Sequence, residues 1–136
     1  MSISVTLNID GPRDPHYVLE VAEAFSQAVR VMNHLTRDHA ALRYPSEVDG
    51  LVCYLSAAAA MTPQLLGQVS RWLAVEQEAG RVRVPAGEHA GNPVRAVAAA
   101  RTGLDAASVA ADAFREVLEV VASVTANLGA AEGNES

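Results

Sequence analysis

The residues with the clearest chemical potential form one polar cluster, between positions 33 and 39. His34 and Asp38 are four positions apart, so on a continuous helix they share one face, as two metal ligands would. A metal site needs further ligands, and His16 and His89 fall in flanking or loop segments. His39 follows an apolar helical pattern, where a core histidine with a satisfied hydrogen bond is more common than a ligand. We therefore expect no metal site and no cofactor.

The other candidate catalytic groups are isolated. Glu116 and Glu119 are three positions apart, as are Glu20 and Glu23, but no Glu-x-x-His motif accompanies them, as di-iron bundles require. Cys53 is the single cysteine, so no intrachain disulfide is possible, and its apolar helical surroundings are typical of a buried, inert thiol. No phosphate-binding glycine loop or nucleophile elbow is present. The sequence therefore predicts no catalytic residues and a non-enzymatic protein.

One segment has an order that DNA-binding regulators use. A helix expected over residues 62–80, followed by the basic segment 81–84, is similar to a recognition helix with a basic wing. That helix holds Arg71 beside Glu76 and Glu78, however, and acidic side chains face phosphates unfavourably. The formal net charge of -6 also opposes non-specific binding to nucleic acid. A DNA-binding regulator is therefore the alternative hypothesis, and a nucleic-acid partner is not expected.

Composition indicates a small helical protein. The chain has 136 residues, of which 50% are hydrophobic and only 4% aromatic, so it can bury a core of small and aliphatic side chains. We expect a single domain over 1–129 and a disordered tail over 130–136. The most apolar tract, 110–128, is interrupted by charged residues, and no signal-peptide pattern opens the chain. These features predict a cytoplasmic, acidic protein without a membrane partner.

Capping side chains divide most of the chain into helices. Proline follows a capping residue at three places: Asp14-Pro15, Thr62-Pro63 and Asn92-Pro93. The expected helices cover about 15–42, 46–61, 62–80 and 93–128. Gly80 should end the third of them, and the fourth should break near Gly103 and restart at Asp105. Short connections then predict an antiparallel bundle of four to five helices.

Two features predict that the protein self-associates. Residues 2–9 alternate between apolar and polar side chains, which predicts a short N-terminal β-strand that needs a pairing partner. A helix over 15–42 would have a heptad seam and would be about 42 Å long. A compact monomer of this size has a radius of gyration of about 14 Å, so the helix would span the whole domain or project from it. A homodimer would satisfy both, by pairing strands or packing the long helices. Another protein partner would cover the same apolar surfaces.

The leading hypothesis is a non-enzymatic interaction or scaffold protein. Trp72, the single tryptophan, has the spacing of a core residue, but it is the first hot-spot candidate if it is exposed. The candidate interaction surface comprises Ile3, Val5, Leu7, Trp72, Arg81 and Arg83.

Two segments in the middle half of the chain resemble small, alanine-rich helical proteins of actinobacteria. The segments are Leu42-Arg43-Tyr44-Pro45-Ser46-Glu47-Val48 and Leu65-Leu66-Gly67-Gln68-Val69-Ser70-Arg71-Trp72-Leu73. The resemblance implies an actinobacterial source and a helical fold. It transfers no catalytic or binding residue, because that family has no assigned function.

Overall fold

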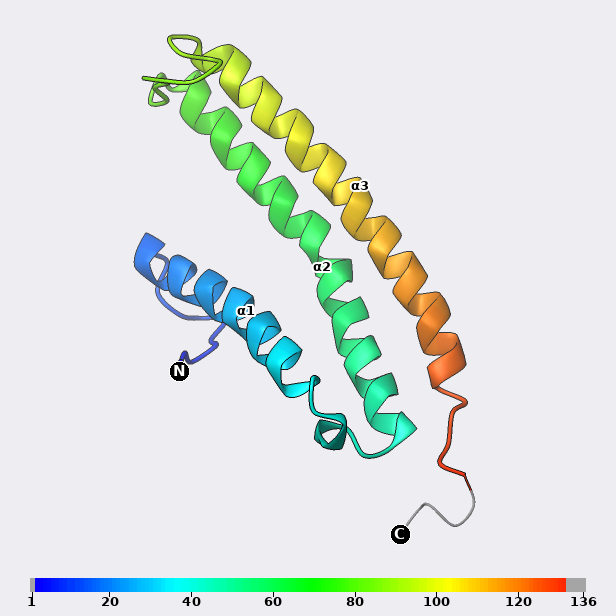
Figure 1. The fold of residues 1–136 in the computed structure, drawn as a ribbon. Helices are drawn as coiled ribbons and strands as arrows, with labels where there is room; N and C mark the ends of the chain where they lie inside the picture. The colour runs from blue at the N-terminus through cyan, green and yellow to red at the C-terminus, as the bar shows by residue number, and fades with distance from the viewer. Residues whose placement is uncertain (1, 132–136) are drawn as a thin grey trace. The chain divides into compact units, whose positions relative to one another are not determined.

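The computed structural model describes residues 2–131 (Figure 1). It contains three α-helices, α1 (Pro15–Leu35), α2 (Pro45–Glu78) and α3 (Pro93–Thr125), and one 3-10 turn, η1 (His39–Ala41). No β-strand occurs among these residues, so the predicted four- to five-helix bundle with an N-terminal strand is wrong. The chain divides into two compact units, the first up to Arg43 and the second from Tyr44. Most of the predicted tail, 132–136, lies outside the described residues.

Helix α1 begins where the sequence predicts and ends earlier. Asp14 is its N-cap and accepts a hydrogen bond from the Tyr17 N–H at 2.9 Å. The helix was expected to reach residue 42 but ends at Leu35. The physical reason is Asp38, whose carboxylate accepts from the Ala40 N–H at 3.0 Å and so caps η1 instead of continuing the helix.

The N-terminal segment is fixed by a tyrosine and not by a partner strand. The Tyr17 hydroxyl donates to the Thr6 carbonyl at 2.7 Å and accepts from the Asn8 N–H at 2.9 Å. The Gly11 N–H donates to the Asn8 carbonyl at 2.9 Å and closes a turn. A Cβ atom at Gly11 would lie 2.7 Å from the Tyr17 ring, so only glycine fits there. The alternating pattern therefore marks an extended segment that folds back onto α1.

The Tyr17→Phe substitution tests this attachment. It keeps the ring and removes the hydrogen bonds of the hydroxyl, so the amide of Asn8 should exchange with solvent markedly faster. We expect a loss of about 1 kcal/mol or less in stability, because net hydrogen-bond contributions are of that size. Hydrogen exchange followed by NMR provides the measurement. Unchanged exchange at Asn8 would show that the tyrosine does not hold the segment.

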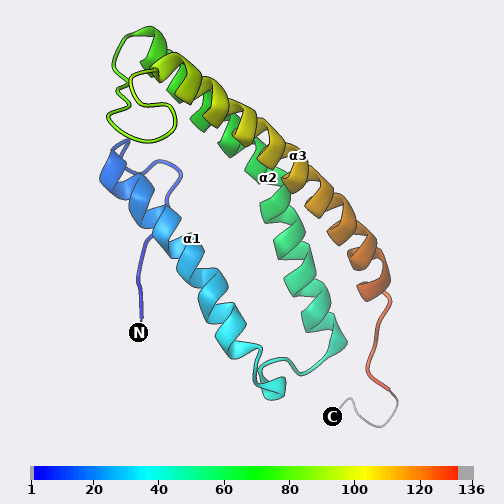
Figure 2. The ribbon, with the colours of Figure 1, turned by 45° about the horizontal axis from the view of Figure 1, so that its top comes forward.

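The second unit is an antiparallel hairpin of α2 and α3, which run side by side in both views (Figures 1 and 2). Two side-chain hydrogen bonds cross between the helices near opposite ends. Thr125 Oγ1 donates to Asp49 Oδ1 at 2.6 Å, and Arg101 Nε donates to Ser70 Oγ at 3.0 Å. The buried residues of the hairpin are small or medium-sized: Ala59, Ser70, Val97 and Thr125. Such residues allow the two helices to approach closely.

Helices α2 and α3 both continue through positions where the sequence predicted a break. Pro63 lies inside α2, and the Thr62 hydroxyl, expected as an N-cap, donates to the Ala58 carbonyl at 2.8 Å. An interior proline costs about 3 kcal/mol and an interior glycine such as Gly103 about 1 kcal/mol. Packing of each helix along its neighbour offsets these costs. The predicted pairs of shorter helices are therefore wrong.

Helix α2 ends as the sequence predicted. Gly80 has a φ of 74°, in the left-handed region that favours glycine. Its N–H donates to the Gln77 carbonyl at 3.1 Å, and the Arg81 N–H donates to the Glu76 carbonyl at 3.0 Å. These two bonds form a Schellman motif, which satisfies the last carbonyls of the helix.

Candidate interaction surface

The residues between α2 and α3 form a seam with steps of three or four. We define the seam by its buried and half-buried members: Val52, Leu55, Ala59, Thr62, Leu66, Ser70 and Leu73 on α2, and Val97, Leu104, Ser108, Ala111, Arg115, Leu118, Ala122 and Thr125 on α3. Its apolar members are the valines, leucines and alanines that hold the hairpin together. The seam uses only part of the apolar surface of each helix.

A second apolar stripe runs beside the seam on each helix. Its α2 members are Tyr54, Ala58, Met61, Leu65, Val69 and Trp72. Its α3 members are Ala100, Gly103, Ala107, Ala110, Phe114, Val117, Val121 and Val124. The larger side chains are strongly exposed: Leu65 is 59%, Trp72 62% and Phe114 53% exposed. The hairpin itself therefore leaves this second stripe uncovered.

The two stripes lie on the same broad face of the hairpin. Each stripe is displaced from its seam by about one residue toward the N-terminus, which is about 100° around an α-helix. Helices α2 and α3 run antiparallel (Figures 1 and 2). A shift of one residue toward the N-terminus therefore turns the stripe of each helix toward the same side of the hairpin. We call this surface the apolar face. No charged residue belongs to either stripe, so the face is uncharged along its length.

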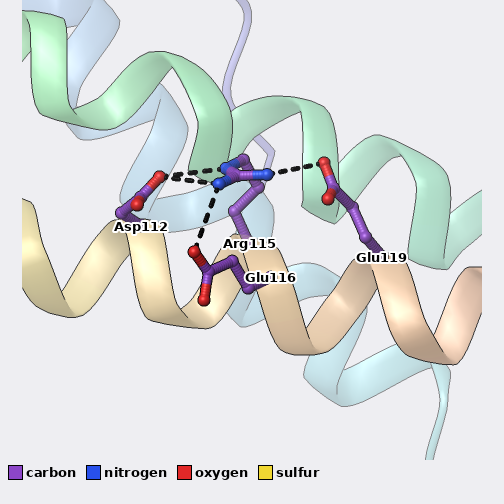
Figure 3. Close-up of polar contacts among 4 residues, drawn as sticks. All are labelled: Asp112, Arg115, Glu116 and Glu119. Carbon is purple, nitrogen blue, oxygen red and sulfur yellow. Dashed lines mark hydrogen bonds and ion pairs between the residues drawn. The ribbon is translucent and has the colours of Figure 1, made fainter.

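The α3 half of the opposite face is acidic. Its acidic members are Asp105, Asp112, Glu116 and Glu119, and the α2 half carries Arg71. The guanidinium of the seam residue Arg115 reaches the acids, with Nη1 at 2.8 Å from Glu119 Oε1 and Nη2 at 2.9 Å from Asp112 Oδ1 (Figure 3). Glu116 Oε1 is 3.7 Å from the same Nη2. The hairpin thus separates an apolar face from an acidic one.

The Arg115 cluster does not provide a catalytic carboxylate pair. Its hydrogen bond with Glu119, followed by those with Asp112, raises the pKa of Arg115. The guanidinium therefore stays charged and engages these acids as a surface ion-pair network. Glu116 and Glu119, one of the two carboxylate pairs named in the sequence, are exposed and lie around this arginine.

The predicted interaction residues fall in three separate places. Ile3, Val5 and Leu7 belong to the N-terminal segment of the first unit, where Leu7 is exposed and Val5 half-buried. Arg81 and Arg83 lie in the connection between α2 and α3, and Trp72 lies on the apolar face. The spacing of Trp72 favoured a core position, but the side chain is exposed, and so is the Cys53 thiol.

Sequence reasoning missed most of the apolar face. The missed large side chains are Tyr54, Met61, Leu65, Phe114, Val117, Val121 and Val124. The signal was present, because Leu65-Leu66 and Trp72-Leu73 give α2 an apolar surface wider than one helical neighbour needs. The width of the apolar surface around α2, and not the period of its apolar residues, indicates that two neighbours pack against this helix.

The segment after α2 does not form the basic wing expected of a DNA-binding regulator. Residues 81–84 contain no strand, and the Arg81 guanidinium is bound to Glu76, with Nε–Oε2 at 2.6 Å and Nη2–Oε1 at 2.9 Å. This hydrogen bonding lowers the pKa of the Glu76 carboxyl and raises the pKa of Arg81. The charge of Arg81 is therefore balanced within the hairpin, which leaves less positive field for phosphates.

The Arg81–Glu76 pair predicts a pH dependence. Because the folded-state pKa of Glu76 is depressed, the pair stabilises the end of α2 above the unfolded pKa, and this contribution disappears as the pH falls through the folded pKa. An NMR titration of the Glu76 carboxyl should have a lower midpoint in the wild type than in Arg81→Gln. Equal midpoints would show that Arg81 does not hold Glu76 in solution.

No metal centre forms from the groups that the structure describes. Residues 2–131 contain no group of three or more metal-ligating side chains placed to hold an ion. His34 lies in the last turn of α1 and Asp38 beyond its end, so the expected pair does not share a helix face.

Among the same residues, one helix, α2, is long and apolar enough to cross a membrane, judged by length and composition alone. The notable tract is residues 51–70, which contains no charged residue. That tract carries all of the α2 members of the apolar face except Trp72.

The apolar face is thus the surface of the hairpin best suited to bind a partner, through apolar contacts and complementary shape. Its members are Ala, Gly, Val, Leu, Met, Phe, Tyr and Trp residues. No family model, curated protein or solved structure matches the chain.

Proposed function

We propose that the chain is a non-enzymatic interaction protein that acts as a self-associating homodimer. The observation that carries the proposal is the exposure of the apolar face along the whole hairpin. Soluble monomers rarely expose contiguous apolar patches larger than a few hundred square ångströms, and larger patches mark interaction sites. A partner that covers this face would therefore stabilise the protein substantially.

The dimensions of the face support a protein partner. The 33 residues of α3 extend about 50 Å, and two adjacent helices are about 20 Å wide, so the face covers roughly 1,000 Å². A standard protein–protein interface buries about 800 Å² on each partner. The face is thus large enough for a stable complex without any other contact.

The proposal rests on a different surface from the one that the sequence indicated. The strand expected to pair with a second copy is absent from residues 2–131, and the helix expected over 15–42 ends at Leu35. The hairpin face replaces both as the reason for self-association. Nothing in the described connection 79–92 favours the alternative of a DNA-binding regulator.

Sedimentation equilibrium of the full chain tests self-association. We expect a mass twice the 14.3 kDa of one chain at micromolar concentrations, with dissociation on dilution. A single-chain mass at every concentration up to the high micromolar range would overturn the proposal.

A further inference from the structure

We infer that the second copy binds on the apolar face itself, hairpin against hairpin, about a two-fold axis that lies in the plane of this face. This inference rests on the proposed self-association and names its surface and symmetry. It places four helices, α2 and α3 of each copy, around one shared core. The argument comes from how large and small side chains are distributed over the face.

The register of the hairpin fixes that distribution. The Asp49–Thr125 and Ser70–Arg101 hydrogen bonds set which residues of α2 and α3 lie at the same level. Leu65 then lies level with Ala107, and Phe114 level with Ala58. In the half near the connection α2 thus carries the large side chains, and at the level of Phe114 α3 carries the larger one.

The pattern differs between the two halves of the face. In the half near the connection, large α2 residues lie beside small α3 residues: Met61, Leu65 and Trp72 beside Ala100, Gly103, Ala107 and Ala110. In the other half, Phe114 lies beside Ala58, while Val117 and Val121 lie level with Tyr54 and Leu51. The contrast between a large and a small helix surface therefore extends over the connection half and is limited to Phe114 and Ala58 in the other half.

The half near the connection is complementary to itself. When two copies stack face to face, a two-fold axis in the interface plane and parallel to the helices places α2 of each copy over α3 of the other at the same level. This exchange brings the large α2 side chains of each copy over the small α3 residues of the other, and Phe114 over Ala58. An isologous interface requires this self-complementarity, because each copy presents the same patch. Small residues opposite large ones also allow close packing without voids.

The length of the face argues against complete coverage by the chain's own first helix. Helix α1 has 21 residues and is about 32 Å long, whereas the face is about 50 Å long and two helices wide. One helix of that length would cover roughly a third of the area. A second hairpin matches the face in both length and width.

The charge distribution argues against a membrane surface as the occupant. Interfacial helices that bind anionic lipids carry Lys and Arg on their polar side. The side of the hairpin opposite the apolar face instead carries Asp105, Asp112, Glu116 and Glu119, and the chain has a formal net charge of -6. These charges would be repelled by an anionic bilayer.

The test uses two single substitutions and a matched control in the full chain. Leu65→Glu and Phe114→Glu each place a charge in a different half of the apolar face. Val109→Glu places the same charge on α3 at a side chain that is 72% exposed and points away from that face. We expect both face variants to sediment as single chains with helical circular dichroism, at concentrations where the wild type and Val109→Glu are dimers.

The outcomes separate this inference from the proposed function. If the wild type is a dimer and both face variants remain dimers, the apolar face is not the interface, and only this inference is overturned. If the wild type is a single chain, both are overturned. Co-sedimentation of that single chain with vesicles of phosphatidylcholine and phosphatidylglycerol would then assign the face to a membrane. If the chain did not co-sediment, the remaining explanation would be that another part of the same chain covers the face.

Spin labels test the position of the interface. Cys53 is exposed and directly follows the half-buried Val52, on the opposite side from the apolar face, so a nitroxide at its thiol should leave the dimer intact. Each labelled dimer then holds one pair of spins, and pulsed electron spin resonance should give one narrow distance distribution because the copies meet in one arrangement. A label at Ala58→Cys in a Cys53→Ser background should weaken the dimer. A Cys53 label that dissociates the dimer, or a tight Ala58→Cys dimer, would contradict the inference.

Discussion

The Val97→Asp variant is expected to lose the α2–α3 hairpin under conditions in which the wild type is folded. Val97 is 6% exposed and is one of the few buried side chains of the hairpin. The change removes the burial of a valine, worth about 1.5–3 kcal/mol, and adds a carboxylate that must be desolvated. We expect a loss of at least about 3 kcal/mol, which is a large part of the stability of a small domain.

Val94→Asp is the matched control for this prediction. Val94 lies three residues earlier in the same helix and is 59% exposed. An aspartate in the first turn of a helix interacts favourably with the helix dipole, so the free energy of unfolding should change by about 0.5 kcal/mol or less. Urea unfolding followed by circular dichroism, at one fixed protein concentration, compares the two. Equal losses in both variants would show that the seam is not the structural core.

The Trp72→Ala variant is expected to weaken the dimer by about 100-fold or more. Trp72 is a large aromatic residue on the apolar face, and buried tryptophans at interface centres typically contribute about 2 kcal/mol or more. A two-fold interface contains the residue twice, so one substitution removes two contacts. The exposed position within one chain predicts that the hairpin still folds. Sedimentation equilibrium over a dilution series measures the change.

Val109→Ala is the control for Trp72→Ala. It shortens an exposed side chain that lies away from the apolar face, so the dissociation constant should change by less than about threefold. A similar weakening in both variants would indicate that helix stability, and not the interface, controls association. An unchanged dissociation constant in Trp72→Ala would place the tryptophan outside the interface.

The parts of the fold that the sequence predicted correctly depend on neighbouring residues. Asp14 and Asn92 each accept a hydrogen bond from the backbone N–H three positions later, at 2.9 Å and 3.1 Å. This geometry needs no distant contact, so the residue types suffice to locate it. The same signal failed at Thr62-Pro63, because the packing of α2 along α3 keeps the helix continuous. The prediction of an N-terminal strand was wrong for a related reason, because a strand needs a pairing partner that its own residues cannot supply.

The candidate surface was harder to predict, because a core and an interface select the same residues. Leu65 and Leu66 are adjacent and chemically identical, yet Leu66 lies in the seam and Leu65 is exposed. Phe114 and Leu118 differ in the same way on α3. Periodicity gives the direction of each side chain around its helix but not the identity of what lies there. Only the antiparallel pairing of the helices separates the stripe that one chain buries from the stripe that it leaves uncovered.

Dilution of the wild type, with both Trp72 emission and sedimenting mass recorded, tests the central claim most directly. Trp72 is the single tryptophan, so its fluorescence reports on the apolar face alone. We predict that dilution shifts the emission to longer wavelength as the mass falls from two chains to one, with the same midpoint for both. An emission maximum that stays constant while the mass halves would contradict the account, because the two copies would then meet at a different surface.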